Sequence, residues 1–218
     1  MTVYHQETDA ISRAIAVDPS VVNSRNEVAS DLLHTGDTPL TVACRYSRID
    51  ILKMLIDSGA DVNMNNNRFT GLMIACHSGH DDVVRVLIQS GASINTRERG
   101  GYTALMIACN QGHEDIVDML ISNGADVNMQ ENSGTTCLIL ACRSGHASVV
   151  NLLLRYNPAI NIHDAYGNTS LHMVSFQGHT EVLKLLLQTK DVDINIQDKY
   201  GNTPLILGCK YRHKDIIF

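Results

Sequence analysis

Cysteine and histidine recur together along the 218-residue chain, and both are common zinc ligands. Four pairs stand four positions apart, a spacing that would bring both side chains to one face of a continuous helix: Cys76 and His80, Cys109 and His113, Cys142 and His146, and Cys209 and His213. Each pair is interrupted by a glycine or its substitute, such as Gly79 or Arg212. Because a left-handed residue ends a helix, the two members should lie on different helices. A closed site needs four converging ligands, so we expect no metal.

The sequence also lacks the motifs of the common enzyme classes. No glycine-rich phosphate loop, nucleophile elbow or close carboxylate pair interrupts it. We therefore predict a protein that is not an enzyme, with no catalytic residues, no cofactor and no small-molecule substrate.

The amino-acid composition indicates what kind of protein this is. Apolar residues make up 44% of the chain and charged residues 18%, which is typical of a folded protein. The 17 basic and 23 acidic residues give a formal net charge of −6, which argues against a nucleic-acid binder that relies on phosphate contacts. No apolar run suits a membrane span and no secretory signal is visible at the start. We expect an intracellular protein of the cytoplasm, the nucleus or both, without direct membrane insertion.

A repeated segment of the sequence determines where the cysteine and histidine side chains fall. Its marker is a threonine spaced by 32 to 34 residues, at Thr38, Thr70, Thr103, Thr136, Thr169 and Thr203. The clearest repeat, residues 101–128, reads GYTALMIACNQGHEDIVDMLISNGADVN. Thr103 is suited to cap a short helix and Gly112 to end it, while Glu114 begins a second, aliphatic helix that stops before Gly124. Each repeat is therefore predicted to be a helix, a turn, a second helix and a hairpin loop.

This order of residues resembles the ankyrin repeat from about Leu32 to Phe218. The threonine, an Ala-Cys pair, Gly-His, the aliphatic second helix and Ala-Asp-Val-Asn recur in order. The family's Thr-Pro-Leu-His is complete in no repeat, and its histidine appears only at His172. Arg68 replaces the glycine before the marker, and Ser47-Arg48 and Arg212-His213 replace Gly-His in the first and last repeats, which should loosen those turns. The resemblance implies an all-α solenoid of stacked helix-turn-helix repeats with β-hairpin loops, stabilised by neighbours.

The two ends of the array are irregular. Residues 1–34 are predicted to be an atypical N-terminal capping half-repeat, in which Thr8–Ala16 aligns with a second helix and residues 27–33 add a helical turn. Residues 35–218 form six ankyrin-like repeats, the last one truncated. Because Phe218 falls within a second helix, we expect the native chain to continue.

The positions of the cysteines and histidines within the repeat predict structural roles for them. Cys44, Cys76, Cys109, Cys142 and Cys209 share one small position of the first helix, where we expect them to be buried and inert. Stacked equivalents should lie roughly 8–10 Å apart, beyond the limit of about 7 Å between the Cα atoms of a disulfide. Cys137 lies outside this column. The histidines after the turn glycine should bond to turn backbone groups, and a pH switch is the alternative.

Aromatic residues gather at one set of positions. In ankyrin-like proteins, a concave face is lined by loop tips and by the exposed ends of first helices, and partners typically bind there. We define the concave face as the positions four, three and one before each marker threonine and seven and eight after it. Seven of the ten aromatics and five basic residues fall there, with one acid. The partner-binding residues we predict are Arg45, Tyr46, Phe69, Arg99, Tyr102, Arg143, Tyr166, Phe176, Lys199, Tyr200, Lys210 and Tyr211.

Tyrosine and arginine dominate protein interfaces, and positive potential attracts an acidic partner. We therefore predict a monomeric interaction module or scaffold that binds an acidic protein or peptide segment on this face. One alternative is a structural spacer or a substrate-recruiting adaptor domain of a larger protein. Another is a single-stranded nucleic-acid binder, which would use the same residue types but is disfavoured by the net charge.

A recurring asparagine closes each second-helix turn, at Asn63, Asn95, Asn128, Asn161 and Asn195. Its plain role is hydrogen bonding that fixes the loop. Similar asparagines in ankyrin-like proteins are substrates of an iron- and 2-oxoglutarate-dependent hydroxylase, so the resemblance implies possible hydroxylation at these five positions.

Overall fold

The computed structural model describes residues 12–25 and 36–213 of the chain. Contacts divide the chain into two compact units, Met1–Glu98 and Arg99–Phe218, which we call the N-terminal unit and the C-terminal unit. Among the described residues, no helix is both long and apolar enough to cross a membrane.

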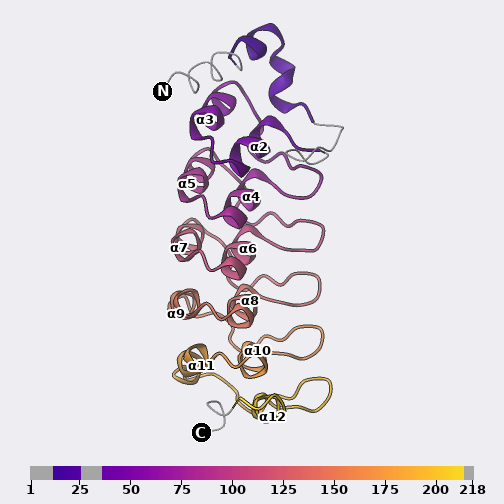
Figure 1. Ribbon diagram of the computed structural model, residues 1–218, viewed down its shortest axis with the longest axis vertical. Helices are drawn as coiled ribbons and strands as arrows, with labels where there is room; N and C mark the ends of the chain where they lie inside the picture. The colour runs from indigo at the N-terminus through magenta and orange to yellow at the C-terminus, as the bar shows by residue number, and fades with distance from the viewer. Residues whose placement is uncertain (1–11, 26–35, 214–218) are drawn as a thin grey trace. The chain divides into compact units, whose positions relative to one another are not determined.

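Short helices in pairs build the N-terminal unit. Its described elements are a helical stretch over residues 12–17, a 3₁₀ helix η1 (Pro19–Asn23), and the α-helices α2 (Pro39–Arg45), α3 (Ile49–Asp57), α4 (Gly71–Ser78) and α5 (Asp81–Gln89). The first helices α2 and α4 pack on each other, the second helices α3 and α5 do the same, and η1 contacts α2 (Figure 1). The predicted boundary at residue 34 stays a prediction, since residues 1–11 and 26–35 lie outside the described part.

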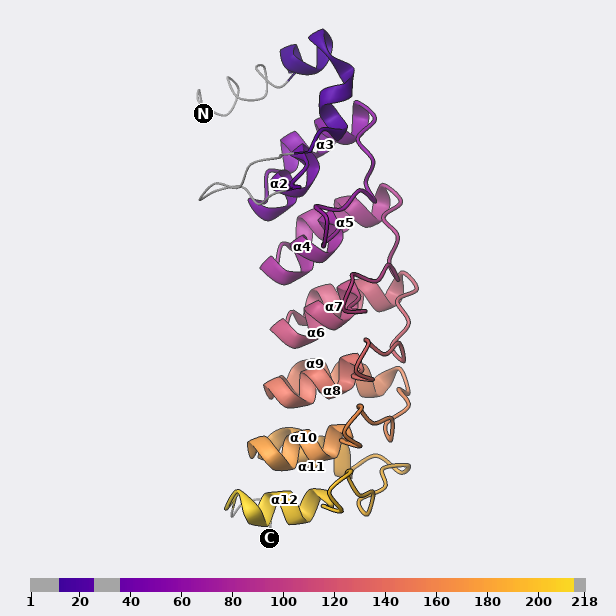
Figure 2. The same ribbon diagram turned by 90° about the vertical axis from the view of Figure 1, so that its right-hand side faces the viewer.

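The same pairing continues in the C-terminal unit. Its described helices are α6 (Ala104–Gln111), α7 (Glu114–Ser122), α8 (Cys137–Ser144), α9 (Ala147–Arg155), α10 (Ser170–Gln177), α11 (Thr180–Leu187) and α12 (Pro204–Lys210). Figure 2 shows α6, α8, α10 and α12 stacked in one layer, and α7, α9 and α11 stack as a second layer behind it. The predicted all-α architecture of stacked helix-turn-helix repeats is confirmed.

Threonine caps begin the first helices, as the sequence predicts. The side-chain oxygen of Thr103 accepts a hydrogen bond from the backbone N–H of Met106 at 3.3 Å, and Thr136 caps α8 in the same way. Gly112 ends α6 with a φ of 82°, in the left-handed region that glycine adopts without strain. Ser47 and Arg212 reach the same region, with φ of 53° and 62°, so these two turns keep their shape at the cost of backbone strain.

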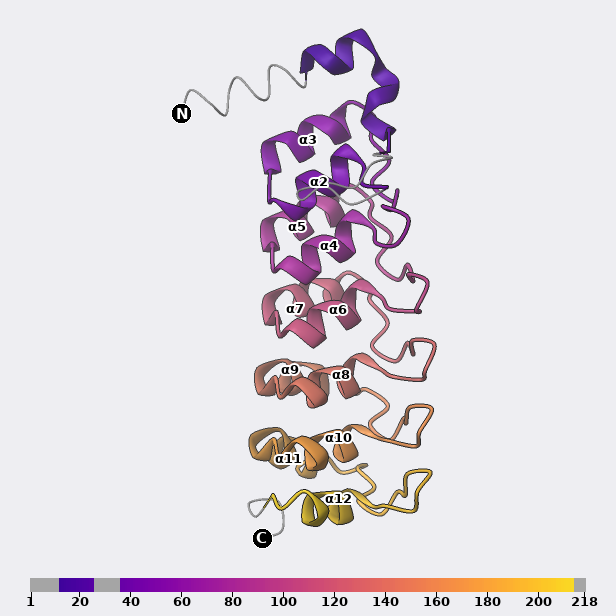
Figure 3. The ribbon, with the colours of Figure 1, turned by 45° about the vertical axis from the view of Figure 1, so that its right-hand side comes forward.

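The loops between repeats are turns in which no strand forms in the described residues; one isolated bridge joins Asn65 and Thr70. Two backbone bonds close each of the loops before α8, α10 and α12. In the loop before α10, Asp164 N–H donates to the carbonyl oxygen of Asn168 at 2.9 Å, and Gly167 N–H donates to that of Asp164 at 3.0 Å. The loops project on the side of the first helices (Figure 3).

Successive loop tips of the C-terminal unit are bonded to one another. The backbone N–H of Asn132 donates to the carbonyl oxygen of Gly100 at 3.0 Å. Ala165 bonds Ser133 in the same way at 2.6 Å, and Lys199 bonds Tyr166 at 2.9 Å. This ladder fixes the spacing of the side chains that the tips present.

Candidate interaction face

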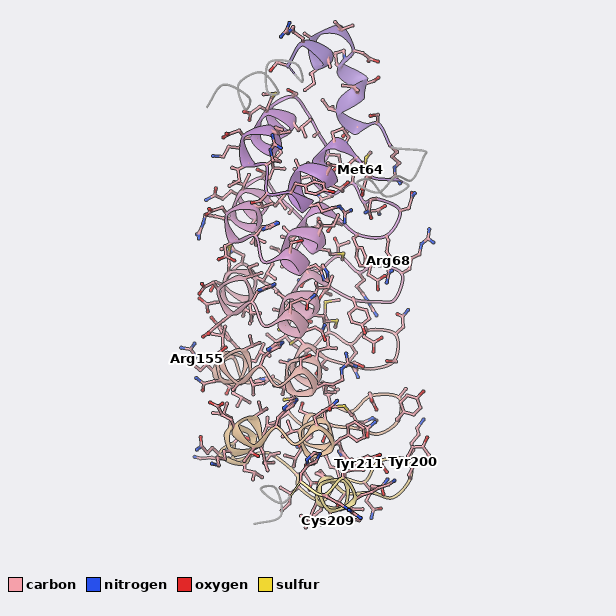
Figure 4. The ribbon with its side chains drawn as sticks, viewed as in Figure 1. Met64, Arg68, Arg155, Tyr200, Cys209 and Tyr211 are labelled. Atoms are coloured by element: carbon pink, nitrogen blue, oxygen red, sulfur yellow. The ribbon has the colours of Figure 1, made fainter. Side chains whose placement is uncertain are left out.

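The C-terminal unit holds most of the predicted concave face. Its loops carry Arg99, Tyr102, Tyr166, Lys199 and Tyr200, and the ends of its first helices carry Arg143, Phe176, Lys210 and Tyr211. Four of these aromatics are exposed, Tyr166 by 57%, Phe176 by 38%, Tyr200 by 77% and Tyr211 by 44%. Figure 4 shows Tyr200 and Tyr211 on the same side of the unit, whereas Arg155 of α9 points away on the other side.

Two aromatic rings from neighbouring repeats form a contact on this face. The ring centroids of Phe176 and Tyr211 lie 4.5 Å apart with an interplanar angle of 68°, an edge-to-face arrangement that aromatic pairs favour. The ammonium of Lys210 lies 5.8 Å from the Tyr211 centroid, within the range of a cation–π interaction. The pair is thus held in place while both rings keep exposed surface.

Tyr200 is positioned by a carboxylate beneath its loop. One oxygen of Asp198 accepts from the backbone N–H groups of Tyr200 and Asn202, at 2.9 and 2.8 Å. Burial alone would raise the pKa of Asp198, but the hydrogen bonds from Asn202 and Tyr200 outweigh it and lower the pKa. The most exposed aromatic of the face therefore extends from an ordered loop.

An acid plays the same role in the preceding loops. Asp164 accepts from the backbone N–H groups of Tyr166 and Asn168, and Glu131 accepts from those of Ser133 and Thr135. Burial opposes ionisation of Glu131, yet these bonds and those from the two hydroxyls lower its pKa to about 2. These acids are not among the site residues predicted from the sequence. Their signal is an acid or asparagine five residues before the marker threonine in each of the last five repeats.

The N-terminal unit presents a different surface. Arg45, the only basic residue among its described concave positions, bonds the buried carboxylate of Asp37 at 2.9 Å, and Asn66 bonds the same oxygen at 2.8 Å. Arg45 is therefore a structural charge, and its pair leaves no positive excess there. Tyr46 remains 46% exposed.

Phe69 is half-buried beside a residue that the concave-face definition omits. The guanidinium of Arg68 lies 4.5 Å from the Phe69 ring centroid and 3.6 Å from the carboxylate of Glu98. Figure 4 shows Arg68 on the loop side of its repeat. The sequence signal was available, because an arginine stands where other repeats have glycine; Asn67, with a φ of 69°, takes over the left-handed conformation.

The histidines connect successive repeats rather than their own turns. The Nε2 of His146 donates to the carbonyl oxygen of Asn110 at 3.0 Å, and His179 bonds Arg143 in the same way at 3.2 Å. His80 and His213 make the equivalent bond to Arg45 and Phe176. The bond that we expected within the turn thus fixes the end of the preceding first helix, which is part of the concave face.

The recurring asparagines also bridge repeats. The side-chain oxygen of Asn128 accepts from the backbone N–H of Ala159 at 2.8 Å, and that of Asn161 accepts from Asp193 at 3.0 Å. Asn63 makes the equivalent bond to Ser93. Hydroxylation of Asn63, Asn95, Asn128, Asn161 or Asn195 stays a prediction, which mass spectrometry of protein from eukaryotic cells would test by an added oxygen.

The cysteine column is buried as predicted up to its last member. Cys44, Cys76, Cys109 and Cys142 are fully buried, all six cysteines are free thiols, and Cys209 is exposed. Burial raises the pKa of the Cys44 thiol to about 12. Figure 4 shows Cys209 on the side of α12 that faces away from α10. Within the described residues no group of three or more histidine, cysteine or acidic side chains could hold a metal ion.

Comparison with known proteins agrees with this geometry. The family model "Ankyrin repeats (3 copies)" matches residues 3–98, 96–164 and 138–218, nearly the whole chain. Among curated proteins, Alpha-latrotoxin-Lt1a of Latrodectus tredecimguttatus is 35% identical over 60 residues, which are 28% of this chain and 4% of that protein. The matched stretch is thus a small part of the toxin's length.

Proposed function

Because the chain belongs to the ankyrin repeat family, whose repeats generally bind other proteins, we propose that it binds an acidic protein segment on the concave face of its C-terminal unit. Ankyrin repeats are typically non-enzymatic, and we propose the same for this chain. The observation that carries the proposal is the exposed cluster around Phe176 and Tyr211, joined by Lys210 and the Tyr200 loop.

Charge supports an acidic partner for this unit. Its concave positions include Arg99, Arg143, Lys199 and Lys210 and no acid. The nearby carboxylates of Glu131, Asp164 and Asp198 accept hydrogen bonds from their own loop N–H groups. A basic surface of this kind speeds association with an acidic segment and disfavours basic competitors.

Affinity purification with the intact chain tests the proposal. A double variant, Phe176→Ala with Tyr200→Ala, should lose the proteins that the wild type retains, because an aromatic anchor typically contributes about 2 kcal/mol or more. Tyr156→Ala is a matched control, since Tyr156 is 39% exposed but ends α9 in the second-helix layer. Retention of the same proteins by the double variant, at wild-type helix content, would refute the proposal.

Single-stranded nucleic acid is the rival ligand. A labelled oligonucleotide should bind weakly or not at all to the wild type near physiological salt. Tight binding would favour the rival instead if the logarithm of the association constant fell linearly with the logarithm of the salt concentration.

A further inference from the structure

On the concave face of the C-terminal unit, successive repeats present one side chain each from the same repeat position, at regular spacing. Arg143, Phe176 and Lys210 occupy the same position, seven residues after the marker threonine, in three successive repeats. Their helices α8, α10 and α12 pack in that order. A basic residue, an aromatic and a second basic residue therefore follow one another along the stack.

The backbone under these three side chains is fixed by bonds from the next repeat. His179 bonds the carbonyl oxygen of Arg143 at 3.2 Å, and His213 bonds that of Phe176 at 2.9 Å. Each bond joins the end of one first helix to a histidine of the following repeat. The spacing of the three side chains is thus a property of the folded stack.

These side chains leave their functional groups available. Arg143 and Lys210 are exposed, and neither forms an ion pair with another described residue. Arg143 makes a long hydrogen bond of 3.5 Å to the side chain of Asn110. The positions seven and eight after the marker threonine hold no carboxylate in any of the four repeats of this unit.

We propose that this face binds an extended segment of a partner protein. The segment carries two acidic residues about five to six positions apart, with a large apolar side chain between them. Packed helices lie about 8–10 Å apart, so Arg143 and Lys210, two repeats apart, are separated by about 16–20 Å. An extended chain rises about 3.3 Å per residue, so this distance corresponds to about five to six residues. The apolar side chain packs on Phe176 and Tyr211, and the two carboxylates meet Arg143 and Lys210. This inference rests on the proposed function and adds a spacing to it.

A random library of displayed 12-residue peptides tests the spacing directly. The wild-type chain is the bait, and peptides that also bind the Phe176→Ala, Tyr200→Ala double variant are removed. The selected peptides should be enriched in pairs of Asp or Glu five or six positions apart that flank an aromatic or large aliphatic residue. Enrichment of peptides with no acidic pair, or with pairs at any separation, would overturn the inference while leaving the binding face intact. Failure to obtain any peptide that depends on Phe176 and Tyr200 would overturn the proposed function as well.

Charge reversal then assigns each acid. Arg143→Glu and Lys210→Glu should each weaken binding of a selected peptide about tenfold or more, since each variant loses a hydrogen bond between charged groups. Changing one of the two peptide acids to lysine should restore binding to Arg143→Glu, and changing the other should restore binding to Lys210→Glu. Lys184→Glu on α11, an exposed lysine of the second-helix layer, is the matched control and should change little. Equal losses in all three variants, or no restoration, would contradict the assignment.

Discussion

The imidazole of His146 bonds the backbone oxygen of Asn110 at 3.0 Å, and its ring lies where a side chain on Gly112 would have to go: an added Cβ there would come within 2.6 Å of Nδ1. One histidine therefore fixes the end of the preceding first helix and requires glycine at its C-terminal turn. His179 stands in the same relation to Gly145, so the relation is a feature of the stack.

His146→Ala should lower the free energy of unfolding by about 1–3 kcal/mol, because a carbonyl loses its partner and the space over Gly112 is emptied. Urea unfolding followed by circular dichroism measures the loss. His163→Ala is the control, since the His163 side chain is exposed and, among the described residues, bonds only the backbone oxygen of its neighbour Asp164. Equal stability of the two variants would show that the connection between repeats contributes nothing.

Ser47→Gly should stabilise the N-terminal unit by about 1 kcal/mol, because Ser47 holds a φ of 53° that costs an L-residue energy and glycine little. Ser58→Gly is the opposite control: Ser58 has a φ of −89°, so glycine there only adds freedom to the unfolded chain. The unfolding midpoint should rise for the first variant and fall for the second. A fall for both would mean that the turn is not strained.

Stability should decrease in mildly acidic solution because of His172. This buried imidazole accepts the backbone N–H of Thr169 on Nδ1 at 3.2 Å and donates from Nε2 to the carbonyl oxygen of Asn202 at 3.1 Å. Burial lowers its pKa, against the opposing effects of the Asn202 bond and the charges of Asp198 and Asp164. The unfolded chain then takes up a proton first, so the stability is present above about pH 6.5 and is lost as the pH falls from there through the lowered folded pKa.

Unfolding midpoints from about pH 8 down to pH 5 measure this effect. His172→Met should flatten the profile in that range, since Met73 and Met106 occupy the equivalent position in other repeats. An unchanged profile in the variant would assign the pH dependence to another group.

Alkylation at neutral pH should label Cys209 rapidly and spare Cys44, Cys76, Cys109 and Cys142 until the chain is unfolded in urea. Cys209 is exposed, whereas burial raises the pKa of the thiols of Cys44, Cys76 and Cys142. Mass spectrometry of labelled peptides resolves the sites. Fast labelling of Cys109, which is fully buried in α6, would contradict the repeat register.

The periodic part of the structure was predictable from the sequence because each local signal agrees with the others. Thr103 and Thr136 cap the helices that they were expected to cap, and Gly112 ends α6. Contacts between repeats were not predictable to the same degree. The partners of His146 and Asn161 lie 36 and 32 positions away in the sequence, and only the stacked structure brings them within hydrogen-bond distance.

The positions of the candidate site could be predicted from the sequence, but the pairing of its charged side chains could not. The sequence gathers Arg45 and Lys210 into one basic set, yet the buried Asp37 neutralises Arg45, while Lys210 stays exposed beside Tyr211. Counting charges along a sequence does not show which of them are paired. The positive surface that we propose for binding therefore belongs to the C-terminal unit.

Site-specific photocrosslinking tests the central claim, that the concave face of the C-terminal unit is the working surface. A photoreactive phenylalanine analogue replaces Tyr200 in one protein and Lys184 of α11 in another, and each is irradiated with a partner retained in the affinity purification. We predict a covalent adduct at position 200 that weakens when Phe176→Ala is added, and none at position 184. An adduct at position 184 with none at position 200 would place binding on the second helices and contradict the account.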